Sequence, residues 1–256
     1  MKIMVVSYGD DGHKNHFLAI AQRAGVEAII FDAGGYPNGS DEIGIDYYCA
    51  AEPRLSLSID GKEINAGEVK GVWWRRPRGA RGVNRNPMGE YVRYEGEVVV
   101  RSLKEILPQA NWVSDPEATR MACRKPVQLM VAKGLGMKIP QTCITNSPER
   151  VKEFISHLSG RRLIMKPVGT SFVELSPSGK PGGPPNQAIF TQVVPSELIL
   201  ENLGMVKNCP VIFQEAVEKD SDMRITVVDD EVFCAEITLD GCSNPNNVDW
   251  RNYDGV

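Results

Sequence analysis

The sequence has little of what would mark a metal-binding, disulfide-stabilised or membrane protein. Its six cysteines contain no Cys-x-x-Cys pair, and its 3 histidines are not clustered. This spacing argues against a zinc site and against a disulfide scaffold, and favours a reducing cytoplasm. No apolar run approaches a membrane span, and the first residues lack the apolar stretch and cleavage site of a signal peptide. We therefore expect a cytoplasmic protein with no membrane partner.

An excess of positive charge is also missing. The net charge of −4 and the pI near 5.5 argue against a nucleic-acid partner. The turn YGDDGH after the first strand is not a Gly-x-Gly-x-x-Gly fingerprint, so a dinucleotide cofactor is not expected. With 256 residues, 42% hydrophobic and 24% charged, the chain has the composition of a globular protein of one large or two smaller domains.

The first half reads as a parallel α/β domain. Strands at 2–7 and 26–32 flank a helix at 13–24. Apolar residues then alternate up to Asp60-Gly61, which predicts a hairpin turn. A further strand is expected at 71–77 and a helix at 90–107. The apolar positions of that helix are Tyr91, Tyr94, Val98 and Leu103.

The second half reads as α+β on antiparallel strands, after a boundary near 108–116. Asp115 can cap a helix that begins at Pro116, and Pro126 restarts a helix that ends at Gly134 or Gly136. The further elements expected are a strand at 139–145, a helix from a cap at Asn146 or Ser147 to about 158, strands at 162–168 and 188–194, a helix at 195–203, a strand at 210–217 and a hairpin at 222–239. We predict three parts: an N-terminal α/β domain (1–114), a central subdomain (115–214) and the start of a C-terminal lobe (215–256).

Lys166 is the most informative residue. In RRLIMKPVG the period-2 alternation puts Leu163 and Met165 on one face of a strand and Ile164, Lys166 and Val168 on the other. An ammonium among apolar neighbours is costly unless it meets an anion. A ligand phosphate would offset that cost, and so would an internal carboxylate.

Two neighbours favour the phosphate. Residues 169–187 hold four glycines and four prolines, and Gly169, Thr170 and Ser171 offer backbone N–H groups and hydroxyls that could wrap a phosphate. Lys125 stands at a helix start, where free N–H groups already favour an anion. Taken alone, the loop reads as a flexible hairpin tip and Lys125 as an ordinary surface lysine. Taken together with Lys166, they indicate a phosphate site.

Polar residues on the last strands extend this pattern. Glu215 shares a strand face with Phe213 and Val217, which is unusual for a purely structural strand. If 229–231 form the turn of the final hairpin, Arg224 pairs with Glu236, Thr226 with Cys234 and Val227 with Phe233. An ordinary cross-strand ion pair therefore competes with a functional role for Arg224.

Five arginines follow Trp73 and Trp74 within eleven residues: Arg75, Arg76, Arg78, Arg81 and Arg85. One reading is a pair of core aromatics followed by a solvated basic loop. The other is a site for a carboxylate-bearing peptide, because Arg binds carboxylates through two parallel hydrogen bonds. Arg75 and Arg76, directly at the strand end, are the favoured substrate residues.

Taken in series, these features resemble the ATP-grasp superfamily, and within it the ligases that mature microviridin-type peptides, called graspetides. The supporting stretches are VWWRRP (72–77), NWVSDP (111–116), KPVQLMVAKGLGMKIPQTCITN (125–146), LIMKPVG (163–169), CPVIFQEAV (209–217), DMRITVVDDEVFCAEI (222–237) and VDWR (248–251). Ribosomal-protein glutamate ligases share the ATP machinery, but WWRRP looks more like the peptide-maturing group.

The resemblance implies ATP and Mg²⁺ as cofactors, and a site residue by residue. Lys125 and Lys166 would contact the α and β phosphates. Glu215 and the backbone around Val217, with Gln214 beside them, would read the adenine edge, and Asp222 would bind the ribose. Arg224 and Arg251 would face the γ-phosphate or the acyl-phosphate. The family's metal ligands lie well beyond VDWR, whereas this chain stops at Val256, so the metal ligands are unknown and the C-terminal lobe is expected to be incomplete.

The implied function is an ATP-dependent ligase that forms side-chain ester or amide crosslinks in a ribosomally made precursor peptide with a leader and an acidic core. Its steps would be carboxylate activation by phosphoryl transfer, then attack by a hydroxyl or amine. Two alternatives remain: a ligase that adds an amino acid to a protein or a small acid, and a nucleotide-binding or peptide-binding module without catalysis. A homodimer is left open.

Overall fold

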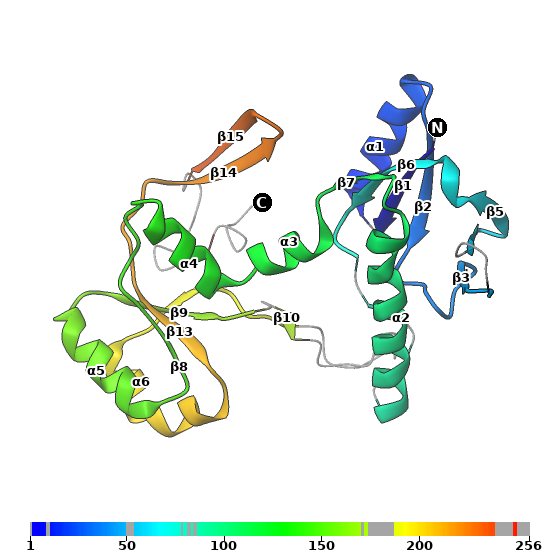
Figure 1. Ribbon diagram of the computed structural model, residues 1–256. Coiled ribbons are helices and arrows are strands. Elements are labelled where there is room, and N and C mark those ends of the chain that lie inside the picture. Colours follow the sequence, from blue (N-terminus) through cyan, green and yellow to red (C-terminus); the bar gives the residue numbers. More distant parts are fainter. Residues whose placement is uncertain are drawn as a thin grey trace. The chain divides into compact units, whose positions relative to one another are not determined.

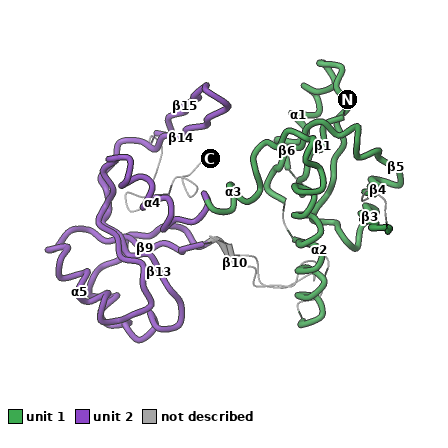
Figure 2. The backbone as a smooth tube through the Cα atoms, viewed as in Figure 1, with its two compact units in different colours: residues 1–121, 176–183 green, residues 122–175, 184–256 purple. Residues whose placement is uncertain are grey.

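The chain folds into two compact units. The computed structural model describes residues 2–8, 11–49, 54–77, 79–80, 83, 86–169, 172–173, 187–238 and 248–249, with the backbone alone at 172–173 and 187–188. Unit 1 comprises residues 1–121 and 176–183, and unit 2 comprises residues 122–175 and 184–256 (Figure 2). The division of the second half into a central subdomain and a lobe from residue 215 stays a prediction.

Unit 1 is built on a parallel sheet with the strand order β2-β1-β6-β7 (Figure 1). Its elements in chain order are β1 (Lys2–Ser7), α1 (Gly12–Arg23), β2 (Glu27–Asp32), β3 (Glu42–Asp46), β4 (Arg54–Ile59), β5 (Lys62–Asn65), η1 (Ala66–Glu68), β6 (Val69–Trp74), α2 (Pro87–Ile106), β7 (Asn111–Val113) and α3 (Pro116–Ala122). Val5 of β1 lies between Ile30 of β2 and Trp73 of β6. The predicted β-α-β start in a parallel sheet is confirmed.

The predicted hairpin of unit 1 is also present. β4 and β5 pair around Asp60 and Gly61, and Ile59 lies opposite Lys62. Both turn residues have positive φ angles, 50° and 71°, as a two-residue hairpin turn requires. β3 completes this small antiparallel sheet, order β3-β4-β5. Leu57 is buried in the same core as β1, β2 and β6.

Helix α2 buries a different face from the one its apolar residues indicate. Leu103 is buried as expected, but Tyr91, Tyr94 and Val98 are exposed. The buried face instead includes Gly96, where an added Cβ would lie 3.2 Å from a Pro37 carbon. The glycine lets the helix lie close to the loop after β2, and a hydrophobicity pattern does not reveal such a close approach.

Unit 2 is built on an antiparallel sheet with the order β12-β9-β13-β8. Its elements in chain order are α4 (Lys125–Gly134), β8 (Thr142–Thr145), α5 (Pro148–Leu158), β9 (Leu163–Pro167), β10 (Phe172–Val173), β11 (Gln187–Ala188), β12 (Gln192–Val193), α6 (Ser196–Glu201), η2 (Leu203–Asn208), β13 (Val211–Glu215), β14 (Ser221–Val228) and β15 (Glu231–Thr238). Two predicted caps are confirmed: Ser147 accepts from Arg150 N at the start of α5, and Asp115 accepts from Ala118 N at the start of α3.

The two faces of this sheet are chemically different. Leu163, Met165 and Phe213 face a core shared with α5, α6 and η2. Alternation along the strands puts Lys166 and Gln214 on the opposite face. The predicted alternation of β9 is thereby confirmed: Lys166 and Gln214 share the second face with Ile164 and Ile212, which are both buried.

The predicted register of the last hairpin is wrong by one residue. The turn is Asp229-Asp230 alone, so Glu231 starts β15 and Val227 lies opposite Val232. Arg224 therefore lies opposite Ala235 rather than Glu236. Asp229 has a φ of 49°, and aspartate tolerates this left-handed conformation better than most residues, which permits the tighter turn. The other predicted pairs move with it: Thr226 lies opposite Phe233 and Ile225 opposite Cys234.

Among the described residues, no helix is both long and apolar enough to cross a membrane.

Candidate functional site

Lys166 lies where the sequence predicts, on the face of β9 opposite to Leu163 and Met165. It is opposite Ile212 of β13, and its Nζ donates to Gln214 Oε1 at 2.7 Å. Burial lowers the pKa of Lys166, and the positive charge of Lys125 lowers it further. Among the described residues no carboxylate forms an ion pair with Lys166, although the charge of Asp249 acts on it in the opposite direction. The ammonium is thus held by a neutral acceptor.

Lys125 reaches the same end of β9. It is the first residue of α4, and its Nζ donates to the carbonyl oxygens of Pro167 at 2.5 Å and of Gly169 at 3.2 Å. Pro167 follows Lys166 directly, so the two ammonium groups meet at one strand end. The mutual electrostatic effect on the pKa of Lys166 agrees with this proximity. The structure therefore brings together the two lysines that the sequence singled out.

Gln214 links Lys166 to a residue that the sequence analysis missed. Its Nε2 donates to Thr142 Oγ1 at 2.6 Å, and Thr142 Oγ1 donates to Pro140 O at 2.8 Å. The three side chains come from three adjacent strands, β9, β13 and β8. No local signal in TCIT marks Thr142, because its role depends on a strand that begins about seventy residues later in the chain.

Asp249 was also missed as a separate residue, although it lies within the VDWR stretch. It is only 5% exposed, and its Oδ2 accepts from Thr191 N at 3.0 Å. Its negative charge favours the charged form of Lys166. A buried aspartate near two lysines balances part of their positive charge.

Glu215 lies on the other face of β13 from Gln214. Its carboxylate pairs with Arg161 Nη1 at 2.6 Å and accepts from Gln141 N at 3.4 Å. Its backbone N donates to Gln141 O at 2.9 Å. The Glu215 carboxylate is thus already paired with Arg161 at the end of β13. Val217, two residues further along the chain, is exposed.

Asp222 and Arg224 share one face of β14. Asp222 Oδ2 accepts from Lys219 Nζ at 2.5 Å, and the same ammonium donates to Val248 O at 3.1 Å. Lys219 was missed, yet its spacing of three residues from Asp222 is a signal that could have found it. Arg224 is exposed.

Three predicted site residues, Thr170, Ser171 and Arg251, lie outside the described residues. Also within the described part of the chain, no three side chains of His, Cys, Asp or Glu gather closely enough to hold a metal ion. No ligand set for Mg²⁺ is therefore assigned among these residues.

The two favoured arginines lie in unit 1. Arg75 Nε is 3.1 Å from Asp11 Oδ2, an ion pair that is largely buried although it is not aligned as a hydrogen bond. Its guanidinium lies 5.8 Å from the centre of the Trp73 ring, and Trp73 packs against Phe17. Arg76 is exposed and has a φ of 44°. The structure thus orders Arg75 through its own carboxylate partner and leaves Arg76 open to solvent.

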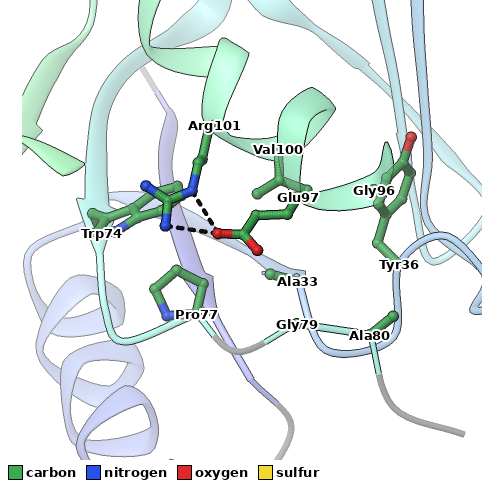
Figure 3. A pocket seen from close by; sticks show the side chains of 10 residues that line it. All are labelled: Ala33, Tyr36, Trp74, Pro77, Gly79, Ala80, Gly96, Glu97, Val100 and Arg101. Carbon is green, nitrogen blue, oxygen red and sulfur yellow. Dashed lines mark hydrogen bonds and ion pairs between the residues drawn. The ribbon is translucent and has the colours of Figure 1, made fainter. Parts of the chain in front are cut away.

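An open hollow lies beside this segment, between α2 and the loops that follow β2 and β6 (Figure 3). Its lining includes the side chains of Tyr36, Trp74 and Val100. At its rim Glu97 pairs with Arg101, which also pairs with Glu117. Because these charges satisfy one another, the hollow suits an apolar group better than an ion.

The lysine end of β9 is chemically suited to a polyphosphate. Two ammonium groups converge there, and their partners include neutral oxygens, which leave the positive charges to be neutralised by a phosphate. Charge-assisted hydrogen bonds to phosphate are roughly twice as strong as those to neutral acceptors. The residues present thus fit a nucleoside triphosphate.

Comparison with solved structures agrees with this chemistry. The macrocyclase MdnC of Microcystis aeruginosa, bound with precursor peptide MdnA, is 25% identical with a TM-score of 0.79, over 93% of this chain and 76% of that chain. The chain has an ATP-grasp fold and resembles the graspetide ligases. A RiPP-associated ATP-grasp ligase of Chryseobacterium gregarium, in complex with ADP and a leader and core peptide, is 25% identical with a TM-score of 0.77, over 98% and 72%.

The ATP-grasp ligase PsnB, complexed with minimal precursor, Mg and ADP, shares the fold at 21% identity and a TM-score of 0.62, over 90% of this chain and 70% of that chain. No model of a protein family and no curated protein matches the sequence. The ATP-grasp assignment therefore rests on the fold, and the mixed α/β architecture agrees with it. The homodimer finds no support in these comparisons.

Proposed function

We propose that the chain is an ATP-dependent ligase that activates a carboxylate of a ribosomally made precursor peptide and joins it to a hydroxyl or amine. The observation that carries the proposal is the meeting of Lys125 and Lys166 at the end of β9 on a sheet of ATP-grasp type. The neighbours bound to precursor peptides, ADP and Mg support the same assignment.

In this proposal Lys125 and Lys166 bind the α and β phosphates of ATP. An ammonium has three donors, so each lysine would bind a phosphate oxygen while its neutral partner, Pro167 O or Gln214 Oε1, still holds it. The added hydrogen bond is charge-assisted, and no internal ion pair of Lys166 has to break. Lys125 also donates to Gly169 O, so Gly169 lies beside this ammonium.

The remaining roles follow the resemblance to the ATP-grasp ligases. Glu215 and the backbone around Val217, with Gln214 beside them, would read adenine at the end of β13, and Asp222 would bind the ribose. Arg224 shares the face of Asp222 on β14 and, with Arg251, would face the γ-phosphate. Thr170 and Ser171 would wrap the phosphates. Mg²⁺ would supply neutralisation of the phosphate charge.

The proposed reaction balances as follows. A peptide carboxylate oxygen attacks the γ-phosphorus, the bond to the β-phosphate oxygen breaks, and ADP leaves with that electron pair. A hydroxyl or amine then attacks the acyl carbon, phosphate leaves, and the nucleophile loses its proton. The chain's cations position the phosphates and neutralise developing charge, which are the main contributions to such a transfer.

Arg75 and Arg76 are the proposed contacts for the peptide. Asp11 holds the Nε side of Arg75, which leaves its terminal nitrogens to meet a carboxylate. The left-handed backbone of Arg76 supports a role as well, because strained residues persist mainly where function needs them.

The decisive experiment combines the protein, ATP, Mg²⁺ and an acidic peptide that contains Ser, Thr and Lys, encoded beside the gene. We expect the peptide to lose the mass of one water per linkage, and one ADP to form for each linkage. Omitting ATP is the control. A gain of mass would favour addition of an amino acid, and nucleotide binding without ADP would favour a binding module.

A further inference from the structure

We propose that Thr142 is a positioning residue of the nucleotide site: its hydroxyl fixes the orientation of the Gln214 amide, which in turn holds the Lys166 ammonium in place. The inference rests on the proposed nucleotide function and adds a residue to that site. We call Thr142, Gln214 and Lys166 the relay.

The direction of each hydrogen bond in the relay follows from proton counting. A threonine hydroxyl has one proton, and Thr142 donates it to Pro140 O at 2.8 Å. Toward Gln214 the hydroxyl oxygen can therefore only accept, so it faces the amide nitrogen at 2.6 Å. This leaves the amide oxygen for Lys166 at 2.7 Å. The Thr142 hydroxyl and the Lys166 ammonium, which can only donate, thus favour the same orientation of the amide.

Burial strengthens this preference for one orientation of the Gln214 amide. Gln214 is 4% exposed, so water is not at hand to satisfy a misplaced group. A flipped amide would point two N–H donors at an ammonium and its oxygen at a hydroxyl whose proton is in use. Both contacts would then lack an acceptor–donor match.

The strand pairing holds the relay in register. Thr142 lies directly opposite Gln214 across β8 and β13, and Gln214 lies opposite Ile164, two residues before Lys166 on the same face of β9. Without the hydroxyl, the amide loses one of the two contacts that hold it, and Lys166 spends less time where phosphates would meet it. Loss of one such hydrogen bond corresponds to about fivefold weaker nucleotide binding.

The test compares Thr142→Val, which removes the hydroxyl at nearly constant shape, with Thr142→Ser, which keeps it. Thr145→Val is the matched control, because Thr145 Oγ1 accepts from Ser147 N in the same strand but takes no part in the relay. Two quantities are measured: the affinity for AMPPNP with Mg²⁺ by calorimetry, and the acetylation of Lys166 as a function of pH by peptide mass spectrometry.

We expect Thr142→Val to bind AMPPNP about fivefold more weakly and to show faster acetylation of Lys166 at a given pH, since a less firmly held Gln214 oxygen is a poorer acceptor for the charged form of Lys166. Thr142→Ser should resemble the unaltered protein in both measurements, and so should Thr145→Val. A merely structural role of Thr142 would not move the acetylation profile of Lys166.

An unchanged Lys166 profile in Thr142→Val, or a Thr142→Ser protein that behaves like Thr142→Val, would overturn the relay. If the unaltered protein does not bind AMPPNP, the proposed nucleotide function fails, while the acetylation profiles still decide the relay. If circular dichroism shows Thr142→Val to be unfolded, Thr142→Ala is measured in the same way.

Discussion

At the scale of single residues, Lys166 and Gln214 define the site. Lys166 is half-buried and hydrogen-bonded to the Gln214 amide, so its charged form loses solvation free energy. A bound anion would offset that loss. Lys125 lies close enough to add to the electrostatic cost. Positive charge is therefore concentrated at this strand end before any ligand is bound.

Replacing Lys166 with methionine should separate binding from stability. We expect nucleotide binding to weaken by about 2 kcal/mol or more, roughly thirtyfold, since a charged hydrogen bond to phosphate is lost. The free energy of unfolding should change by less than about 1 kcal/mol, because relief of the buried charge offsets the unpaired Gln214 oxygen. Calorimetric titration with AMPPNP and urea denaturation measure the two quantities.

Lys133→Met is the matched control, since Lys133 is exposed in the last turn of α4. Equal loss of affinity in both variants would contradict a specific role for Lys166.

Proton linkage gives a second residue-scale prediction. Burial and Lys125 hold the pKa of Lys166 below its ordinary value of 10.5, and phosphates should raise that pKa. Between the two pKa values the complex holds more protons than the free protein, so binding should take up protons and weaken as pH rises. Calorimetry of AMPPNP binding in buffers of different ionisation enthalpy measures the uptake; release of protons over this range would refute the prediction.

The same pKa affects folding in the opposite sense. In the unfolded chain Lys166 returns to a pKa near 10.5 and binds its proton more tightly than in the folded chain. The unfolded state therefore holds more protons between the lowered pKa and 10.5, and the contribution of Lys166 to stability rises with pH across that window.

At the scale of elements, the sequence predicted what depends on local pattern. The capping of α3 by Asp115, the start of α4 at Lys125 and the alternation of β9 all follow from neighbouring residues. Thr142 and Asp249 could not be found in this way, because their partners lie on other strands or far along the chain. The register of the last hairpin failed because one residue, Asp229, accepts a positive φ angle.

The corrected register can be tested by a disulfide. Ile225 lies directly opposite Cys234, and counting from the two-residue turn places them in a non-hydrogen-bonded pair with Cα atoms about 4.5 Å apart. This separation suits a disulfide. We expect Ile225→Cys to form one with Cys234 under mild oxidation, detected by mass spectrometry of the cleaved protein.

Thr226→Cys is the control for the register. Thr226 lies opposite Phe233 and points to the other face of the hairpin, so it should remain a free thiol. The predicted register from the sequence would reverse these two outcomes.

At the scale of the whole molecule, the proposed roles divide between the two units. The proposed nucleotide residues, from Lys125 to Arg251, belong to unit 2, whereas Arg75 and Arg76 belong to unit 1. Nucleotide and peptide would then be recognised by residues of different compact units. Elements with fully paired backbone, such as β1 and β13, provide rigid supports for both.

Hydrogen exchange can test this division. AMPPNP with Mg²⁺ should slow exchange in β9, β13 and the start of α4 by about tenfold or more, since a ligand bound to the folded state suppresses local opening. The strands β1, β2 and β6 should change little. A peptide added alone should instead protect the residues after β6. Protection of β1 and β2 by the nucleotide alone would argue against a nucleotide site confined to unit 2.

The partner of Lys166 is an amide, and its acidic counterpart is only one nucleotide away, because codons for glutamine and glutamate differ at their first base. A carboxylate at position 214 would form an ion pair with the Lys166 ammonium, whereas the amide gives it only a neutral hydrogen-bond acceptor. An incoming phosphate would then meet an ammonium that is already neutralised, with a second negative charge beside it. Among randomly mutated genes that are selected for ligase turnover, we therefore expect Gln214→Glu to be depleted early.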